Sequence, residues 1–374
     1  MSNPEKIIRR ITNGIGIPNI VEILSRNMGP TDLQSLLLET YRDMVSRLQI
    51  KDILRQHEDN SFVKPSAINQ KISTKVDKLL YDCIPKTFDA VELSPLNPLG
   101  TNSIIAGIDQ RNVISTIRNT EVSADATTAL ALECAKRRKS GSKAINLCTS
   151  HRTTRAQNFD AIPGFLSHFR IFALASADRD RGFEKFETEN LLQHLKFYLS
   201  AIKKLSKMDA YEVNNIEVFI SDMRIIECIV AKEQIPREEI RNNTQNSSFD
   251  VFSGFDVRMP RDITDPLAEI SPDLISYYEI KNPAILLAKI KKNVIDRLIK
   301  IYPQTKFVFE MNRIAGIGHY ETATFKIRAR NRRGEVYPLV DGGVCNWTKR
   351  ILANKKERLM VSGFGTELFC MNFN

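Results

Sequence analysis

Basic side chains gather in three runs, and they are the residues whose chemistry the sequence indicates most directly. The runs consist of Lys136, Arg137, Arg138, Lys139 and Lys143; Arg328, Arg330, Arg332 and Arg333; and Lys349, Arg350, Lys355, Lys356 and Arg358. Together with a formal net charge of +10, they indicate an anionic partner such as a nucleotide, tRNA or another polyphosphate. Each run alone is also typical of a solvated loop or helix face, so the charge indicates a class of partner and no single site.

Cysteine and histidine are scattered, which argues against a metal site. None of the six cysteines forms a C-x-x-C pair and the five histidines are equally dispersed, so we expect reduced, mostly buried thiols and no bound zinc. No long apolar stretch follows the charges of the N-terminus, and no apolar run approaches the roughly 18 residues that span a bilayer. These features predict a cytoplasmic protein without a membrane segment.

The elements that must position the basic runs fall into a helical N-terminal region and a mixed core. Apolar residues at helical spacing predict helices before Pro65, which marks a boundary. We therefore divide the chain into an N-terminal helical region at 1–70 and a core at 71–374. A polar, proline-rich stretch and the long helix that follows it predict an insertion at about 231–305.

The core is predicted to mix strands with helices. Two apolar strands, 144–150 and 168–175, flank a loop, and a helix with one apolar face follows at 191–205. Near the end of the chain, 322–330 and 335–340 are typical of a hairpin, and Trp347 is expected in the core behind it. Consecutive hairpins with helices predict the α+β class, with an antiparallel sheet flanked by helices.

Motifs in the last part of the chain resemble those of histidyl-tRNA synthetase, a class II aminoacyl-tRNA synthetase. RIAGIGHYETATF, which begins at Arg313, resembles the family segment R-G-L-D-Y-Y-T-x-x-x-F. The sequence VDGGV from Val340 looks like G-G-R-Y-D, and SGFGTE, which ends at Glu367, looks like class II motif 3, G-x-G-x-E-R.

The same family order continues upstream. Residues 76–98 look like motif 1, SADAT around Asp125 resembles R-P-E-G-T, and 144–175 look like the strand–loop–strand of motif 2. The resemblance covers about 75–374 and includes an insertion where histidyl enzymes also carry one. It implies a divergent paralogue with the class II fold, and it is equally a resemblance to the regulatory subunit of ATP phosphoribosyltransferase. No counterpart of the family's anticodon-binding domain is expected.

The resemblance also assigns roles by position. It implies that Arg152 is the catalytic arginine at the α-phosphate of ATP, that Phe172 stacks on adenine, and that Asp125 binds the amino group of an amino acid. ATP with Mg²⁺ and a homodimer built on motif 1 follow from the resemblance alone. The implied nucleotide-binding residues are Arg152, Arg155, Arg170, Phe172 and Glu367, and the implied substrate-binding residues are Asp125, Arg313 and Tyr320.

Several family charges are missing. Losing one donor that stabilises charge typically lowers a rate by about 10²–10³, so ordinary histidine activation is not expected. The replacements are Thr154 for the motif 2 glutamate, Leu368 for the motif 3 arginine, Ala315 and Gly318 in the R-G-L-D-Y-Y segment, and Val344 and Asn346 in the G-G-R-Y-D segment.

Three functions stay open from the sequence. The first is a paralogue that binds a nucleotide and forms an adenylate or amide on a non-standard substrate, as an ATP-dependent ligase. The second is a non-catalytic regulatory or scaffold subunit, for which the regulatory subunit of ATP phosphoribosyltransferase is the precedent. The third is a module that binds tRNA or another RNA through the basic runs, with an affinity that falls steeply with salt.

Overall fold

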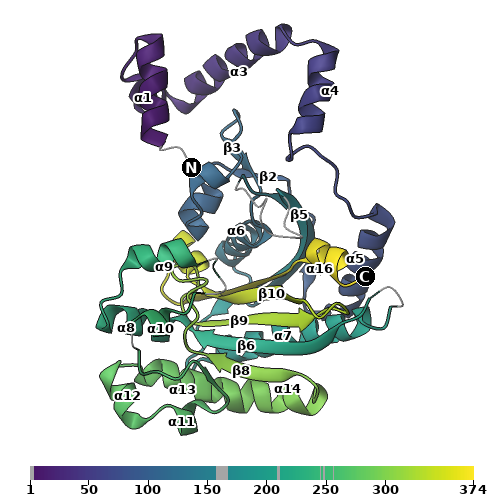
Figure 1. The fold of residues 1–374 in the computed structure, drawn as a ribbon, viewed down its shortest axis with the longest axis vertical. Coiled ribbons are helices and arrows are strands. Elements are labelled where there is room, and N and C mark those ends of the chain that lie inside the picture. The colour runs from purple at the N-terminus through teal and green to yellow at the C-terminus, as the bar shows by residue number, and fades with distance from the viewer. Residues whose placement is uncertain (1–3, 157–166, 209–210, 245, 247–248, 256) are drawn as a thin grey trace.

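A nine-stranded sheet forms the centre of the computed structural model (Figure 1). The structure describes residues 4–156, 167–208, 211–244, 246, 249–255 and 257–374. The strand order is β1-β4-β5-β11-β10-β9-β6-β8-β7, and the neighbours are antiparallel except for β1–β4 and β6–β8. The predicted α+β class is confirmed.

The predicted strands at 144–150, 168–175, 322–330 and 335–340 correspond to β4, β5, β9 and β10, and the sheet contains five further strands. In chain order the nine strands are β1 (Asp89–Ala90), β4 (Ile145–Thr154), β5 (His168–Arg179), β6 (Asn214–Asp222), β7 (Asp262–Ile263), β8 (Lys306–Glu310), β9 (Ala323–Arg330), β10 (Val336–Cys345) and β11 (Glu357–Phe364). β2 (Leu96–Pro98) and β3 (Thr120–Val122) form a separate pair. Most of the loop between β4 and β5, 157–166, lies outside the described residues.

One face of the sheet, which we call the back face, is covered by helices α5 (Gln70–Cys83), α7 (Lys185–Leu205) and α16 (Thr366–Asn372). Leu191, Leu195, Tyr198 and Ile202 of α7 recur at helical spacing, and all four are fully buried in this core. Burying each such side chain contributes roughly 1.5–3 kcal/mol, so the apolar stripe on α7 fixes this helix against the sheet.

The opposite face, which we call the front face, carries a smaller core under α6 (Ala126–Lys139) and α15 (Trp347–Ile351). Ala126 and Ala131 of α6 lie in one cluster with Ala173 and Ala175 of β5. Small side chains on both sides let the helix approach the strands closely. Trp347 is 1% exposed in this core, as predicted.

The region between β6 and β9 is mostly helical and extends the sheet at one edge (Figure 1). Its helices pack into the back core, and β8 and β7 add to β6. The helices are α8 (Met223–Lys232), α9 (Arg237–Asn243), α10 (Val251–Gly254), α11 (Pro266–Glu269), α12 (Pro272–Tyr277), α13 (Lys281–Ile290) and α14 (Asp296–Ile301).

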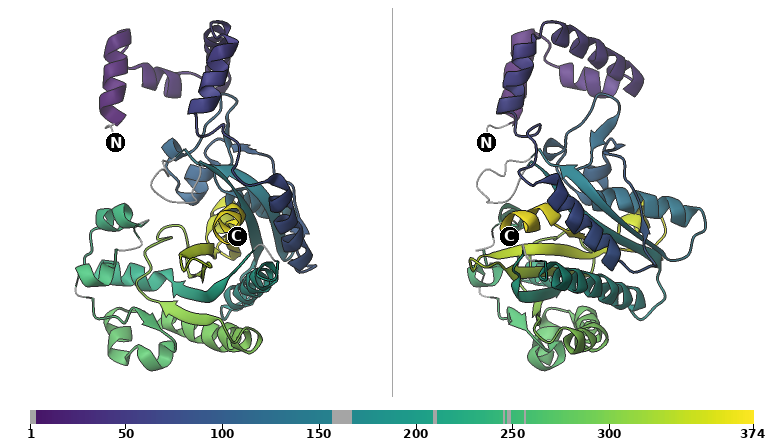
Figure 2. Two further views of the ribbon diagram at one scale, coloured as in Figure 1. Left: turned by 45° about the vertical axis from the view of Figure 1, so that its right-hand side comes forward. Right: turned by 90° about the vertical axis from the view of Figure 1, so that its right-hand side faces the viewer.

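The N-terminal helices stand away from the sheet in every view (Figures 1 and 2). They include α1 (Pro4–Ile15), α3 (Pro30–Ser46) and α4 (Ile50–Asp59), and we call residues 4–59 the N-terminal arm. Thr12 is the one buried residue of the arm. In the part of the chain that the structure describes, no helix is both long and apolar enough to cross a membrane.

Candidate functional site

Asp125 lies at the start of α6, beside the front face. Its Oδ1 accepts hydrogen bonds from the Thr127 backbone N–H at 2.8 Å and the Thr127 hydroxyl at 2.7 Å, which makes it the N-cap of the helix. Its Oδ2 lies 3.4 Å from Nη2 of Arg155, and Nε of Arg155 donates to the Ala124 carbonyl at 3.0 Å. The predicted substrate residue is therefore held by a helix end and paired with a cation.

Arg155 connects Asp125 to an aromatic ring of β5. The guanidinium carbon lies 5.5 Å from the centre of the Phe169 ring, a cation–π distance. Phe169 pairs with Thr153 in the β4–β5 ladder and is half-buried. Asp125, Arg155 and Phe169 thus form one charged and aromatic cluster at the end of β4.

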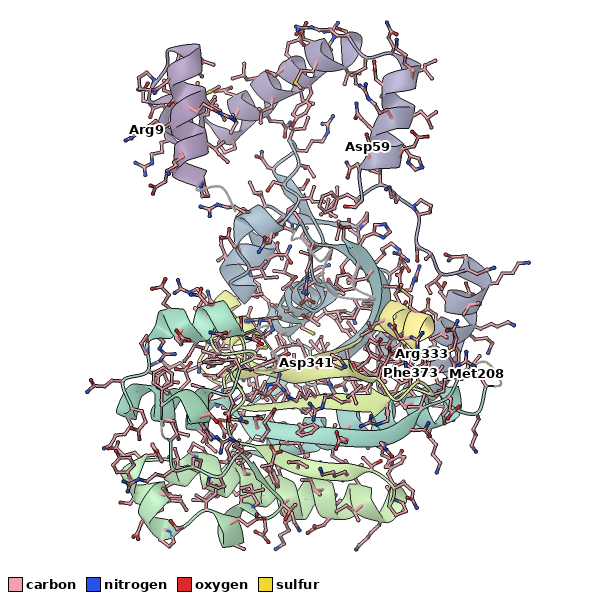
Figure 3. The ribbon with its side chains drawn as sticks, viewed as in Figure 1. Arg9, Asp59, Met208, Arg333, Asp341 and Phe373 are labelled. Carbon is pink, nitrogen blue, oxygen red and sulfur yellow. The ribbon has the colours of Figure 1, made fainter. Side chains whose placement is uncertain are left out.

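Arg313 and Asp341 form a second charged pair on the front face. Nη2 of Arg313 donates to Oδ1 and Oδ2 of Asp341 at 3.0 and 2.8 Å. The Arg313 side chain is 2% exposed and that of Asp341 is 51% exposed; Asp341 lies on β10, near the middle of the sheet (Figure 3). Nη1 of Arg313 is buried and has no hydrogen-bond partner among the described residues. An unpaired buried donor is costly, so the ion pair with Asp341 is what compensates for the burial of this cation.

Tyr320 completes this second pair, and two glycines make room for it. Its hydroxyl donates to Oδ1 of Asp341 at 2.9 Å, and burial raises the pKa of Tyr320 well above its usual value, so the phenol keeps its proton. A Cβ at Gly316, where φ is +94°, or at Gly343 would lie 2.5 or 2.7 Å from atoms of the Tyr320 ring. Glycine is required at both positions because no side chain fits between these backbones and the ring.

His319 is subject to the charges of both pairs. Burial lowers its pKa most strongly, whereas the carboxylates of Asp125 and Asp341 act in the opposite direction. Its ring meets the Trp347 ring edge to face at 4.9 Å. The front face therefore presents two acids, two arginines and a histidine whose neutral form is favoured by burial.

Arg152 and Arg170 lie on the back face. Oε2 of Glu367 accepts from Nη2 of Arg152 at 2.9 Å and from the backbone N–H of Arg170 at 2.9 Å. The Glu367 side chain is 3% exposed, and its other oxygen contacts the Ser66 hydroxyl. Nη1 of Arg170 also pairs with Asp77 of α5 at 3.0 Å. This network ties α5, α16 and the segment after the arm to the β4–β5 hairpin.

Phe172 lies in the back core. The side chain is fully buried, its ring stacks on Phe197 at 5.6 Å, and it meets Tyr81 edge to face at 5.0 Å. Its neighbours belong to α7 and α5, so the ring has no free face for an adenine. The role that the resemblance implies for Phe172 does not agree with this position.

The residues predicted as one site therefore lie in two groups on opposite faces of the sheet. Side chains alternate between faces along a strand, so Phe169 and Phe172, three positions apart, point in opposite directions. Arg152 pairs with Arg170 across the ladder and shares its face. The front group contains Asp125, Arg155, Arg313 and Tyr320, and the back group contains Arg152, Arg170, Phe172 and Glu367.

This arrangement offers few free cationic donors to a triphosphate. Activation of an acid by ATP needs cationic donors that converge on the phosphates from one side. Arg155 and Arg313 are already paired with carboxylates, and the loop 157–166 contains no lysine or arginine. Among the described residues, no group of three or more His, Cys, Asp or Glu side chains could hold a metal ion, so a Mg²⁺ ion at this face would depend on the phosphates of a bound nucleotide.

Three front-face residues, Phe169, Asp341 and His319, lie outside the site that the sequence predicts. Counting alternate positions back from Ala173 and Ala175 of the front core leads to Phe169 and not to Phe172. Asp341 lies inside the VDGGV segment, and His319 precedes Tyr320. The motifs contain or adjoin all three residues, but selecting them requires knowing to which face of the sheet each strand directs its side chains.

Comparisons with known proteins agree with the fold. No family model and no curated protein matches the chain. Three solved structures that each match 83% of this chain have low sequence identity. Histidyl-tRNA synthetase from Nostoc sp. has a TM-score of 0.61, 11% identity and 73% of its length covered. A histidine–tRNA ligase subunit from Alicyclobacillus acidocaldarius has a TM-score of 0.59, 11% identity and 96% of its length covered. An ATP phosphoribosyltransferase regulatory subunit/histidyl-tRNA synthetase from Bacillus halodurans has a TM-score of 0.56, 14% identity and 83% of its length covered.

These likenesses define the fold as that of a class II synthetase. More particularly, it is the fold shared by histidyl-tRNA synthetase and the regulatory subunit of ATP phosphoribosyltransferase, and the predicted resemblance is confirmed.

Proposed function

We propose that this chain binds a small zwitterion of the α-amino-acid kind on its front face and acts as a regulatory or scaffold subunit, not as a ligase. The observation that carries the proposal is the pairing of both front-face arginines with carboxylates, Arg155 with Asp125 and Arg313 with Asp341. Two oppositely charged pairs complement a ligand that carries both charges, whereas a polyanion would meet two acids as well as two arginines.

The proposed binding mode follows from these pairs. The ligand's ammonium group lies against the carboxylates of Asp125 and Asp341, and its carboxylate accepts from Arg155, whose side chain is 30% exposed.

The regulatory role is supported by departures from the synthetase motifs and by one relative. The Bacillus halodurans structure carries the description ATP phosphoribosyltransferase regulatory subunit as well as histidyl-tRNA synthetase. A chain with this fold that binds a ligand without activating it would serve a partner enzyme. We extend the proposal to a cytoplasmic homodimer, which sedimentation of the purified chain tests.

Calorimetric titration with the twenty standard amino acids tests the binding. We expect one or a few to bind, and Asp125→Asn or Asp341→Asn to weaken that binding about tenfold to hundredfold, since each removes a charge-assisted bond. Asp77→Asn on the back face is the matched control and leaves the affinity unchanged. Equal loss in all three variants, or no binding to any amino acid, contradicts the proposal.

A second candidate is nucleotide binding at the same face, which the half-buried Phe169 ring beside Arg155 favours. A base would stack on Phe169 and a phosphate would displace Asp125 from Arg155. A fluorescent ATP analogue tests this candidate. Binding that Phe169→Ala abolishes and Phe172→Ala spares would establish it, and binding that neither variant changes would exclude it.

A further inference from the structure

Two of the three basic runs meet at one end of the sheet. The N-terminal end of β11 pairs with the C-terminal end of β5, Glu357 opposite Arg179, and the end of α6 lies beside them. Glu357, 3% exposed, accepts two hydrogen bonds from Arg138, at 2.8 and 3.0 Å. One buried carboxylate thus joins α6, β5 and β11.

The same arginines fix the backbones that carry free lysines. Arg138 donates to the carbonyls of Ser142 and Lys143, Arg358 donates to the carbonyl of Lys355 at 2.9 Å, and the Asp180 N–H donates to that of Lys356 at 2.7 Å. The side chains of Lys139, Lys143, Lys355 and Lys356 are exposed. In the described part of the chain, no carboxylate pairs with any of these four lysines. We call them, with Arg179 and Arg181, the basic end.

The nearby acids are already engaged. Asp180 pairs with Arg358 at 2.6 Å, and Asp178 lies 3.6 Å from Arg181. Glu189 also contacts Arg181. The surface charge left over at this end is therefore carried by lysines. Between the 141–144 turn and the end of β5 lies a hollow of about 480 Å³, lined by Arg138, Lys143, Asp178, Arg179 and Arg181 among others.

An exposed aromatic ring borders the basic end. Phe183 is 83% exposed and follows Arg181 by two residues. Gly182, Phe183 and Glu184 have φ values of +74°, +56° and +52°, so three successive residues occupy the left-handed region. A bulky non-glycine residue in that region costs roughly 1–2 kcal/mol, and apolar exposure adds no stability in return. The backbone holds the ring in solvent, where Nζ of Lys289 lies 6.0 Å from the centre of the ring, and an exposed ring beside a cation is suited to a ligand.

We infer that the basic end binds a single-stranded nucleic acid, with its lysines on the phosphates and Phe183 stacked on a base. Stacking on an exposed aromatic ring beside a cationic groove is the usual way to hold an unpaired strand. An anionic bilayer is favoured less, because a concave surface with a single aromatic ring offers little area to insert. This inference is independent of the zwitterion site, which lies at the opposite end of β4 and β5.

Fluorescence anisotropy with a short fluorescein-labelled single-stranded RNA, and with DNA of the same sequence, tests the inference on the full chain. Lys355→Glu with Lys356→Glu should raise Kd at least tenfold at low salt. It should also reduce the slope of log K against log salt by about 1.4, since each lost phosphate contact on a single strand removes about 0.7.

The matched control reverses two arginines at the other end of the sheet. Arg332→Glu with Arg333→Glu changes the net charge equally. Both arginines follow Asn331, whose side chain donates to the Asn372 carbonyl at 2.8 Å, and this turn lies far along the strands from Glu357. This control should leave Kd within about twofold. An equal loss in both double variants would show general attraction by a cationic chain and overturn the inference.

Substitutions of Phe183 distinguish the contribution of base stacking from that of charge. Phe183→Ala should weaken binding about tenfold without changing the salt slope, and Phe183→Trp should retain the affinity. Binding to RNA but not DNA, or to both, identifies the strand. No binding to either, or binding only to vesicles that contain phosphatidylserine, overturns the inference.

Discussion

Phe169 and Phe172, three positions apart on β5, show how a ring on the front face differs from a ring in the back core. Phe172 is fully buried between Phe197 and Tyr81, whereas Phe169 is half-buried beside Arg155. We expect Phe172→Ala to lower the free energy of unfolding by about 3–5 kcal/mol because it leaves a cavity. Phe169→Ala should cost about 1 kcal/mol. Urea denaturation measures both, and similar losses would contradict the assignment of the two rings to different faces.

The absence of a side chain at Gly343 makes room for the ring of Tyr320. An added Cβ would lie 2.7 Å from a Tyr320 ring carbon and 2.9 Å from the Ala323 carbonyl oxygen, which is backbone and cannot turn aside. Gly343→Ala should therefore lower the free energy of unfolding by about 1–3 kcal/mol and weaken ligand binding through Tyr320. Gly254→Ala, where a Cβ meets nothing within 4 Å, is the control. A neutral Gly343→Ala would mean that Tyr320 does not lie against β10.

His194 gives the back core a pH dependence. Burial lowers its pKa to about 3, and its ring nitrogens contact the hydroxyls of Ser362 at 2.8 Å and Ser176 at 3.0 Å. An unfolded histidine titrates near 6.5, so below that pH the unfolded state binds a proton that the folded state does not. The stability present above about pH 6.5 is lost as the pH falls toward 3, by about 1.4 kcal/mol per unit.

Comparison with His194→Gln isolates this contribution. The variant lacks the titrating group, so the difference in unfolding free energy between the two proteins should change with pH between 6 and 4. Urea denaturation over that range supplies the difference. A constant difference would show that His194 titrates alike in both states.

At the scale of elements, the order of strands and helices could be predicted, but the facing of the strands could not. Apolar runs mark β4, β5 and α7 because burial requires them, and the motif order supplies the topology. The face to which a strand directs Arg152 depends on where the hairpin register begins, and both candidate faces carry arginine and phenylalanine. Asp125, Arg155, Arg313 and Tyr320 were within reach of prediction, and their separation from Arg152, Arg170, Phe172 and Glu367 was not.

The N-terminal arm should be thermodynamically separate from the sheet. Its residues are exposed or half-buried except for Thr12, and the first described hydrogen bond to the core comes after the arm, between Ser61 and Ser167. Deleting residues 1–59 should therefore change the free energy of unfolding of the remainder by less than about 1 kcal/mol. The urea midpoint of the shortened chain measures this. A loss of several kcal/mol would show that the arm packs on the core.

At the scale of the whole molecule, the two proposals rest on two different arrangements of charge. Charges on the front face are balanced in pairs, which suits a zwitterion, while the excess behind the net charge of +10 includes unpaired lysines at the basic end. The two proposed sites do not overlap, because one lies on the front face of the sheet and the other lies at one end of its strands.

The central claim is that the front face binds an amino acid without activating it, and ATP–pyrophosphate exchange tests this claim most directly. With each standard amino acid and Mg²⁺-ATP present, we predict no exchange above the rate of a protein-free blank. Exchange that depends on one amino acid, and that Arg313→Ala abolishes while Arg152→Ala spares it, would contradict the account and establish a ligase.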